Sequence, residues 1–186
     1  MLWRNSDGST SLWLMNGATV QTYGSFGQVA TSWQISVSGD FNGDNKADMF
    51  WRNSDGSTGL WLMNGTSVQT YGSFGQIPTA WQVAATGDFN GDNKTDLFWR
   101  LADGSTGIWL MNGTSVQAYG SFGQIPTAWQ IAATGDFNGD GKSDLIWRNT
   151  DGNTSLWLMN GTSVQGYGSF GQIPVTWSII DSRGDY

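Results

Sequence analysis

The sequence predicts an all-β fold, a β-propeller built from four-stranded antiparallel blades. Three observations predict it. A unit of 48 residues recurs along the 186-residue chain, with all twelve Trp on three positions of the unit. Each unit contains four short apolar segments separated by turn residues, and these segments are apolar on both faces. Antiparallel sheets that repeat and need cover on both faces are typical of radially stacked blades.

The chain is expected to form a single domain, residues 1–186, made of four repeats. The repeats are residues 3–50, 51–98, 99–146 and 147–186, of which the last is truncated.

One repeat, read from residue 96 to residue 137, gives the order of the strands. The first strand, "DLFWRL", leads through the Asp-Gly turn of "ADGST" into a second, "GIWLMNG", which ends at Asn112-Gly113. Asp-Gly and Asn-Gly pairs are strong hairpin signals. A third strand, "TSVQAYGSF", is followed by the connection "GQIPTA" and by a fourth strand, "WQIAATGDF". The repeat is therefore predicted to be a four-stranded meander.

Both faces of these strands are apolar. In "GIWLMN", Ile108 and Leu110 point to one face, whereas Trp109 and Met111 point to the other. Such a sheet has to be packed between two others. A flat solenoid fits less well, because its terminal repeats would need polar caps.

The two ends of the chain suggest how the ring closes. Residues Met1-Leu2-Trp3 match Met49-Phe50-Trp51, and the final "WSIIDSRGDY" matches the fourth strand of the other repeats. We expect residues 177–183 to pair with residues 2–5, so that four blades close within one chain. The alternative is an eight-bladed ring made from two chains.

Composition excludes several classes of function. The chain has no Cys and no His, which removes disulfides, thiolate and imidazole metal ligands, and His-based catalysis. Its net charge of −7, with only eight Lys and Arg, argues against a nucleic-acid partner. No apolar run approaches the roughly 20 residues of a membrane span. No pair of acids is left over for catalysis, so no enzyme is expected.

An acidic loop recurs three times and is the candidate metal site. In "DFNGDGKSD", oxygen-bearing side chains stand at positions 1, 3, 5 and 9, and the Lys at position 7 can offer its backbone carbonyl. Oxygen ligands in this number suit Ca²⁺ better than Mg²⁺. A plain turn is the competing interpretation, because Asp, Asn and Gly are common in turns. The predicted ligands are Asp40, Asn42, Asp44, Lys46 and Asp48; Asp88, Asn90, Asp92, Lys94 and Asp96; and Asp136, Asn138, Asp140, Lys142 and Asp144.

The stretch "GDFNGDGKSDLIWRNTDGNTSLWLMNGTSV" resembles the FG-GAP or VCBS-type repeat of integrin-like β-propellers, and the resemblance covers nearly the whole chain. It implies calcium in the acidic loop between the first two strands of a blade. Because the fourth copy ends before its second pair of ligands, about three Ca²⁺ per chain are expected. The family is mostly extracellular or periplasmic, which implies a secreted or periplasmic location for this chain.

Some family members resemble lectins, which implies a glycan held between adjacent blades. The candidate contacts are Trp33, Trp81, Trp129 and Trp177, each at the entrance of a strand. The competing interpretation makes all twelve Trp buried packing residues. The alternative function is an adhesion scaffold that binds an extracellular protein, as a monomer or a homodimer.

Four arginines recur directly after a Trp. We interpret each of them as ion-paired with a nearby turn Asp. They are Arg4, Arg52, Arg100 and Arg148.

Overall fold

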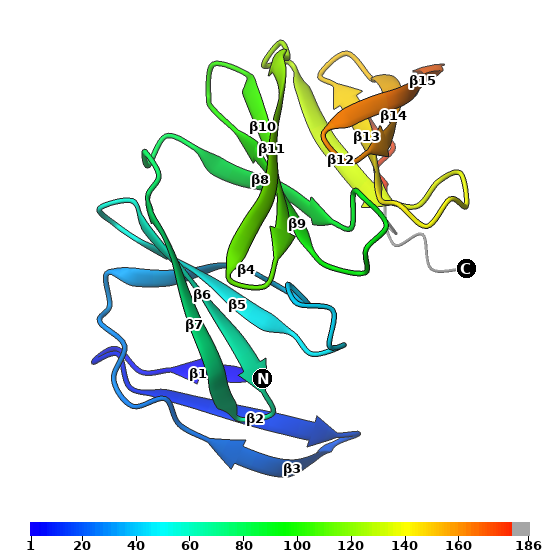
Figure 1. The fold of residues 1–186 in the computed structure, drawn as a ribbon. Helices are drawn as coiled ribbons and strands as arrows, with labels where there is room; N and C mark the ends of the chain where they lie inside the picture. Colours follow the sequence, from blue (N-terminus) through cyan, green and yellow to red (C-terminus); the bar gives the residue numbers. More distant parts are fainter. Residues whose placement is uncertain (180–186) are drawn as a thin grey trace. The chain divides into compact units, whose positions relative to one another are not determined.

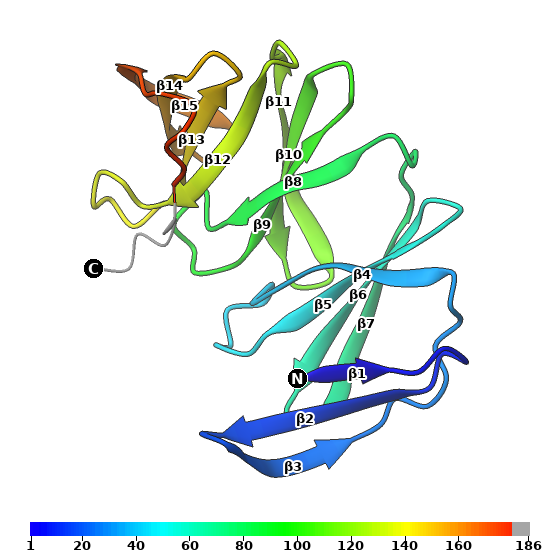
Figure 2. The same cartoon turned by 180° about the vertical axis from the view of Figure 1, so that it is seen from behind.

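The structure, a computed structural model, describes residues 1–179, and in this range it contains β-strands and no helix (Figures 1 and 2). The all-β prediction is confirmed for these residues. It follows that none of them belongs to a helix with the length and apolar character needed to cross a membrane.

The strands of this range form four antiparallel sheets, which are numbered here in chain order. Sheet 1 contains β1 (Leu2–Arg4), β2 (Thr10–Asn16) and β3 (Thr19–Gly24). Sheet 2 contains β4 (Trp33–Gly39), β5 (Asp48–Asn53), β6 (Ser57–Asn64) and β7 (Ser67–Gln76). Sheet 3 contains β8 (Gln82–Gly87), β9 (Asp96–Arg100), β10 (Ser105–Asn112) and β11 (Ser115–Gln124). Sheet 4 contains β12 (Trp129–Gly135), β13 (Asp144–Asn149), β14 (Asn153–Asn160) and β15 (Ser163–Gln172).

In every sheet, neighbouring strands follow one another along the chain, so sheets 2, 3 and 4 are four-stranded meanders. The predicted membership is wrong for one strand: the "WQIAATG" strand, β12, pairs with β13 and not with β11, so each of these sheets begins with the strand that was expected to end the preceding one. Their first two strands pair with the same irregularity, which falls between Ile35 and Val37, between Val83 and Ala85, and between Ile131 and Ala133. A bulge at this place increases the local twist of the strand. These sheets are consistent with the blades of a β-propeller.

Sheet 1 differs because it has three strands, and β1 pairs only with β2 among the described residues. The strand predicted to complete it, residues 177–183, lies mostly outside the described range, and Trp177 to Ile179 are not part of a strand. Ring closure through the termini therefore stays a prediction.

The chain groups into two compact units. The first is Met1–Thr79 with Gly113–Ser115, and the second is Ala80–Asn112 with Val116–Tyr186. The prediction of a single domain over residues 1–186 is not tested by this grouping.

Each unit has a core of large apolar side chains from its sheets. In the second unit, Phe89, Phe98, Leu145 and Met159 are fully buried, and Trp147 is 1% exposed. The first unit has a smaller cluster, which contains Leu12, Met49, Trp51 and Met63. The Trp of the "WR" strand is thus a buried packing residue in both clusters, as the competing interpretation of the tryptophans expects.

The Asp-Gly turn after β9 brings a long connection close to the sheet. Gly104 has φ of +92°, and a Cβ there would lie 2.0 Å from the carbonyl oxygen of Ile125, so only Gly fits. Its carbonyl accepts the Ile125 N–H at 2.8 Å. The turn therefore fixes where the chain leaves β11 on its way to β12.

The same connection is held by an arginine, and here the predicted ion pair is wrong. The Arg100 guanidinium donates to the backbone carbonyls of Ile125, Pro126 and Trp129, at 3.2 Å for each of the first two. Its Cζ lies 5.3 Å from the centre of the Trp147 ring, within reach of a cation–π contact. Three carbonyl oxygens thus replace the expected carboxylate.

The other arginines repeat this arrangement with carbonyl partners 25 to 29 residues further along the chain. Arg4 donates to Val29, Ala30 and Trp33, Arg52 to Ile77 and Pro78, and Arg148 to Ile173, Pro174 and Trp177. We call this repeated contact the arginine clamp.

We predict that Arg100→Lys lowers the free energy of unfolding by about 2 kcal/mol, because one ammonium cannot replace two guanidinium nitrogens that serve three buried or partly buried carbonyls. Urea unfolding measures the change. Arg148→Lys is the matched control: its clamp is solvent-exposed, so its loss is expected to stay below about 1 kcal/mol. Equal stability of Arg100→Lys and the parent chain would contradict the importance of the clamp.

Candidate functional site

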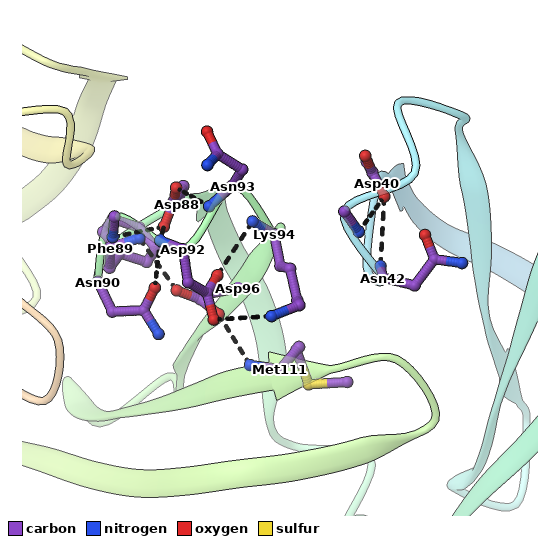
Figure 3. A network of polar contacts seen from close by, with 12 residues as sticks. Asp40, Asn42, Asp88, Phe89, Asn90, Asp92, Asn93, Lys94, Asp96 and Met111 are labelled. Carbon is purple, nitrogen blue, oxygen red and sulfur yellow. Dashed lines mark hydrogen bonds and ion pairs between the residues drawn. The ribbon is translucent and has the colours of Figure 1, made fainter.

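The first candidate site is the acidic loop, seen most clearly between β8 and β9 (Figure 3). Asp88 folds this loop around its own carboxylate. Its Oδ1 accepts the N–H groups of Gly91 at 2.7 Å and Asp92 at 3.1 Å, and its Oδ2 accepts the Asn93 N–H at 2.6 Å. Asn93 has φ of +62°, a conformation that Asn tolerates better than most residues.

The next two oxygen ligands continue the turn in steps of two residues. Asn90 Oδ1 accepts the Asp92 N–H, and Asp92 Oδ1 accepts the Lys94 N–H, both at 3.0 Å. These are Asx-turns, in which a side chain caps the backbone two residues ahead. The structure therefore brings positions 1, 3 and 5 together, and the loops that start at Asp40 and Asp136 have the same bonds.

Position 9 has a different environment. Asp96 is fully buried, and its carboxylate accepts the Met111 N–H at 2.8 Å on Oδ1 and the Phe89 N–H at 3.0 Å on Oδ2. Burial raises the pKa of Asp96 to about 7, although both N–H groups favour the ionised form. Burial likewise raises the pKa of Asp48 and of Asp144. This carboxylate ties the loop to the neighbouring strand β10.

The lysine at position 7 was predicted to contribute its carbonyl, but the structure gives its side chain a role as well. Lys94 Nζ lies 3.2 Å from Asp92 Oδ2, and the equivalent pairs are Lys46 with Asp44 and Lys142 with Asp140. An ammonium at this place neutralises one carboxylate of the loop.

The residues fit a hard cation only in part. Oxygens at positions 1, 3 and 5 share one turn, whereas both oxygens at position 9 accept backbone N–H groups of the core. Over residues 1–179, no group of three or more acidic, His or Cys side chains is arranged to hold a metal ion. These hydrogen bonds form the turn without a bound metal ion. The binding of calcium by the loop stays a prediction.

Two of the loops also contact each other within the second unit. The Ser143 N–H donates to the Asp88 carbonyl at 2.6 Å, and Ser143 Oγ accepts the Asp88 N–H at 3.1 Å. Sequence reasoning missed this contact because position 8 of the loop varies among Ala47, Thr95 and Ser143.

The second candidate site is a pocket of about 430 Å³ in the second unit, where the end of β11 faces β13, β14 and β15. Aromatic rings dominate it: the Trp157 ring centre lies 5.7 Å from that of Phe122, 5.8 Å from that of Tyr167 and 5.2 Å from that of Trp147. Its lining residues are Phe122, Gln124, Ile125, Pro126, Trp129, Trp147, Ser155, Trp157, Val164 and Tyr167.

The pocket contains one buried donor that has no hydrogen-bond partner. This donor is the indole Nε1 of Trp147. Gln124 Nε2 and Ser155 Oγ, in contrast, already donate to the carbonyls of Asp103 and Gly168, at 2.6 and 3.1 Å. The indole Nε1 of Trp51 is likewise buried without a hydrogen-bond partner in the first unit, so this feature belongs to the repeated tryptophan and not to the pocket alone.

Of the four tryptophans predicted to contact a ligand, Trp129 lines this pocket and is half-buried. Trp33 packs against the core cluster of the first unit, where the Trp61 ring meets that of Phe26 at 5.5 Å and that of Tyr71 at 5.7 Å. Trp81 is half-buried, and Trp177 is largely exposed. Sequence reasoning missed Phe122 and Tyr167 on the edge strands β11 and β15 and Trp157 on the inner strand β14, because their positions in the repeat carry no signal of a pocket.

We predict that Asp96→Asn lowers the free energy of unfolding by about 2 kcal/mol, because an amide has one acceptor oxygen and its NH₂ would face a buried N–H donor. Urea unfolding in the presence of a chelator measures it. Asp103→Asn is the control: that exposed side chain needs only one oxygen to accept the Ser105 N–H, so a change within about 0.5 kcal/mol is expected. A stable Asp96→Asn variant would show that the carboxylate does not hold the loop.

The chain matches models of one known family of repeats. The model described as the FG-GAP-like repeat matches residues 40–99 and 88–147, and the model of the FG-GAP repeat matches residues 128–175. The first of these spans more than half of the chain. A search of curated proteins returned no match.

Proposed function

Because the chain belongs to the FG-GAP repeat family, we propose that it is a non-enzymatic binding module whose ligand is a carbohydrate held between neighbouring sheets. The observation that carries this proposal is the aromatic pocket of the second unit. Its volume of about 430 Å³ lies in the range of small-ligand sites.

The chemistry of the lining suits a sugar. A pyranose ring has an apolar face of C–H groups that packs on aromatic rings, while its hydroxyl and amide oxygens accept hydrogen bonds. Trp129, Trp157 and Tyr167 supply the rings.

The aromatic set recurs, which supports more than one equivalent site. In the first unit, Phe26, Trp61 and Tyr71 have the contacts that Phe122, Trp157 and Tyr167 have in the second. Weak sites of equal specificity on one molecule bind a multivalent glycan with avidity.

We predict that the double variant Tyr71→Ala/Tyr167→Ala loses glycan binding by at least about tenfold, because each Tyr supplies an exposed wall of one aromatic set. The parent chain is first screened on a glycan array, and the affinity for the best glycan is then measured by calorimetry.

Tyr23→Ala is the matched control for this experiment. Tyr23 is as exposed as the other two residues, but it lies on the outer strand of sheet 1 and lines neither aromatic set. Unchanged affinity of the control is expected. An array without binding, or a double variant that binds as well as the parent, would contradict the carbohydrate proposal.

We further propose that the three acidic loops bind Ca²⁺, about three ions per chain. The carboxylate and amide oxygens at positions 1, 3 and 5 would be the first ligands, as in Asp88, Asn90 and Asp92, and the charge of the cation would offset the repulsion among the carboxylates. The ion would supply charge compensation and cross-linking of the loop.

We predict that the melting temperature rises by several degrees in millimolar calcium relative to EDTA, because the ion binds the folded loops only. The triple variant Asp40→Asn/Asp88→Asn/Asp136→Asn is expected to lose most of this rise. Equal melting of the parent chain in calcium and in EDTA would contradict the metal proposal and leave the carbohydrate proposal intact.

A protein-binding adhesion scaffold is the second candidate function, and membership of the FG-GAP family supports it. In that case the array gives no signal, and the chain binds a defined extracellular protein. Both functions fit an extracellular or periplasmic location.

A further inference from the structure

Three aromatic side chains lie in series across each of sheets 2, 3 and 4. A Trp on the second strand contacts a Trp on the third strand, and that Trp contacts a Tyr on the fourth strand, which is an edge of the sheet. We call each set of three rings an aromatic triad. The triads are Trp51, Trp61 and Tyr71; Trp99, Trp109 and Tyr119; and Trp147, Trp157 and Tyr167.

The geometry of the three triads is nearly the same. The centres of the two Trp rings lie 4.8 to 5.2 Å apart, and the centre of the second Trp ring lies 5.7 to 5.8 Å from that of the Tyr. The triad of sheet 2 belongs entirely to the first unit, and those of sheets 3 and 4 belong entirely to the second. The aromatic triad is therefore a property of the single sheet.

The exposure of the rings rises along each triad. In sheet 4, Trp147 is 1% exposed, Trp157 is half-buried and Tyr167 is 73% exposed. In the other two triads, the first Trp is at most 3% exposed and the Tyr is at least 67% exposed. Each triad thus joins the apolar core to the solvent through rings in contact.

These rings are the groups of the chain that lose a single electron most readily. Thiols, indoles and phenols are the side chains most easily oxidised in this way, and the chain has twelve Trp and five Tyr but no Cys. The ring separations in the triads lie in the range of direct aromatic contact. Because electrons move rapidly between rings in contact, an electron taken from one ring of a triad can be replaced from the next.

The buried end of each triad disfavours a positive charge. Loss of an electron turns the Trp147 indole into a radical cation inside an apolar core, where an ion without a partner is costly. The Arg100 Cζ lies 5.3 Å from the centre of this ring and repels a second positive charge. In the first unit, the Arg4 Cζ lies 6.0 Å from the centre of the Trp51 ring. An oxidised Trp is therefore unstable at both places.

The buried indole also has no group nearby that can take its proton. Among the described residues, the Nε1 of Trp147 has no hydrogen-bond partner, and neither has the Nε1 of Trp51. Tyr167, in contrast, is in contact with water, so its oxidised phenol releases the proton and becomes a neutral phenoxyl radical. The free energy of the oxidised state therefore falls from the core to the surface.

We propose that each aromatic triad carries an oxidising equivalent from the buried Trp to the exposed Tyr, so that Tyr71, Tyr119 and Tyr167 are the sites at which one-electron oxidation of the chain ends. An inorganic radical takes one electron from the Trp and is itself reduced. The Trp radical cation regains an electron from the Tyr through the second Trp, and the Tyr gives a proton to water. An external reductant then returns an electron and a proton to the phenoxyl radical.

The transfer protects the core. Trp147 belongs to the same buried cluster as Met159. Oxidation of a buried Met makes an apolar side chain polar and disrupts the packing around it. A radical that moves to an exposed Tyr leaves the packing of the cluster intact.

Pulse radiolysis of the full chain with azide radicals, which oxidise Trp, tests the proposal. In the parent chain, the absorption of the Trp radical is expected to decay while that of the phenoxyl radical rises, at a rate independent of protein concentration. The variant Trp61→Phe/Trp109→Phe/Trp157→Phe removes the middle ring of every triad and keeps every Tyr. It is expected to lower the phenoxyl yield at least about twofold, because three of the five Tyr lose contact with an oxidisable ring.

The matched control is Trp33→Phe/Trp81→Phe/Trp129→Phe, which removes as many Trp outside the triads and is expected to leave the phenoxyl yield unchanged. A second variant, Tyr71→Phe/Tyr119→Phe/Tyr167→Phe, removes only exposed hydroxyls and is expected to prolong the life of the Trp radical. It decides the matter if circular dichroism shows that the middle-ring variant does not fold. A parent chain whose Trp radical decays without phenoxyl formation overturns the proposal, and so does a folded middle-ring variant with the yield of the parent or a Tyr variant with an unchanged Trp radical.

Discussion

Within the second unit, the segment that connects sheet 3 to sheet 4 is held by the guanidinium group of Arg100. The guanidinium group donates to the carbonyls of Ile125 and Pro126, which lie between β11 and β12, and to that of Trp129, the first residue of β12. Carbonyls in such a segment need donors, and a planar cation with five N–H groups can serve several of them at once. The direction in which the next sheet starts depends on this contact.

The clamp also shapes the candidate binding pocket. The three carbonyls belong to residues whose side chains line the pocket. Arg100 therefore holds the backbone of this part of the lining through hydrogen bonds. The rest of the lining includes Trp147, Trp157 and Tyr167, whose rings contact one another in series. The same residues therefore pack the sheets together and line the candidate pocket. A rigid aromatic site loses little conformational entropy when it binds a ligand.

Much of the fold follows from local sequence. The Asp-Gly and Asn-Gly pairs fix the hairpins, and apolar residues on both faces of "GIWLMN" require neighbouring sheets. The partners of Arg100 could not be predicted in this way, because backbone carbonyls leave no mark in the sequence. Asp96 was predicted as a metal ligand like its neighbours, yet it directly precedes the buried "LFW" strand, which was the available signal for a carboxylate turned to the core.

The spacing of the clamp has a consequence for how such chains change in length. Arg and its carbonyl partners are separated by 25 to 29 residues, less than one 48-residue period, so each crossing is encoded within a single stretch of gene. Duplication or deletion of one whole 48-residue period copies or removes one complete arginine clamp and leaves the neighbouring clamps unaltered. Recombination can therefore change the number of sheets in steps of one without first breaking the chemistry that connects them.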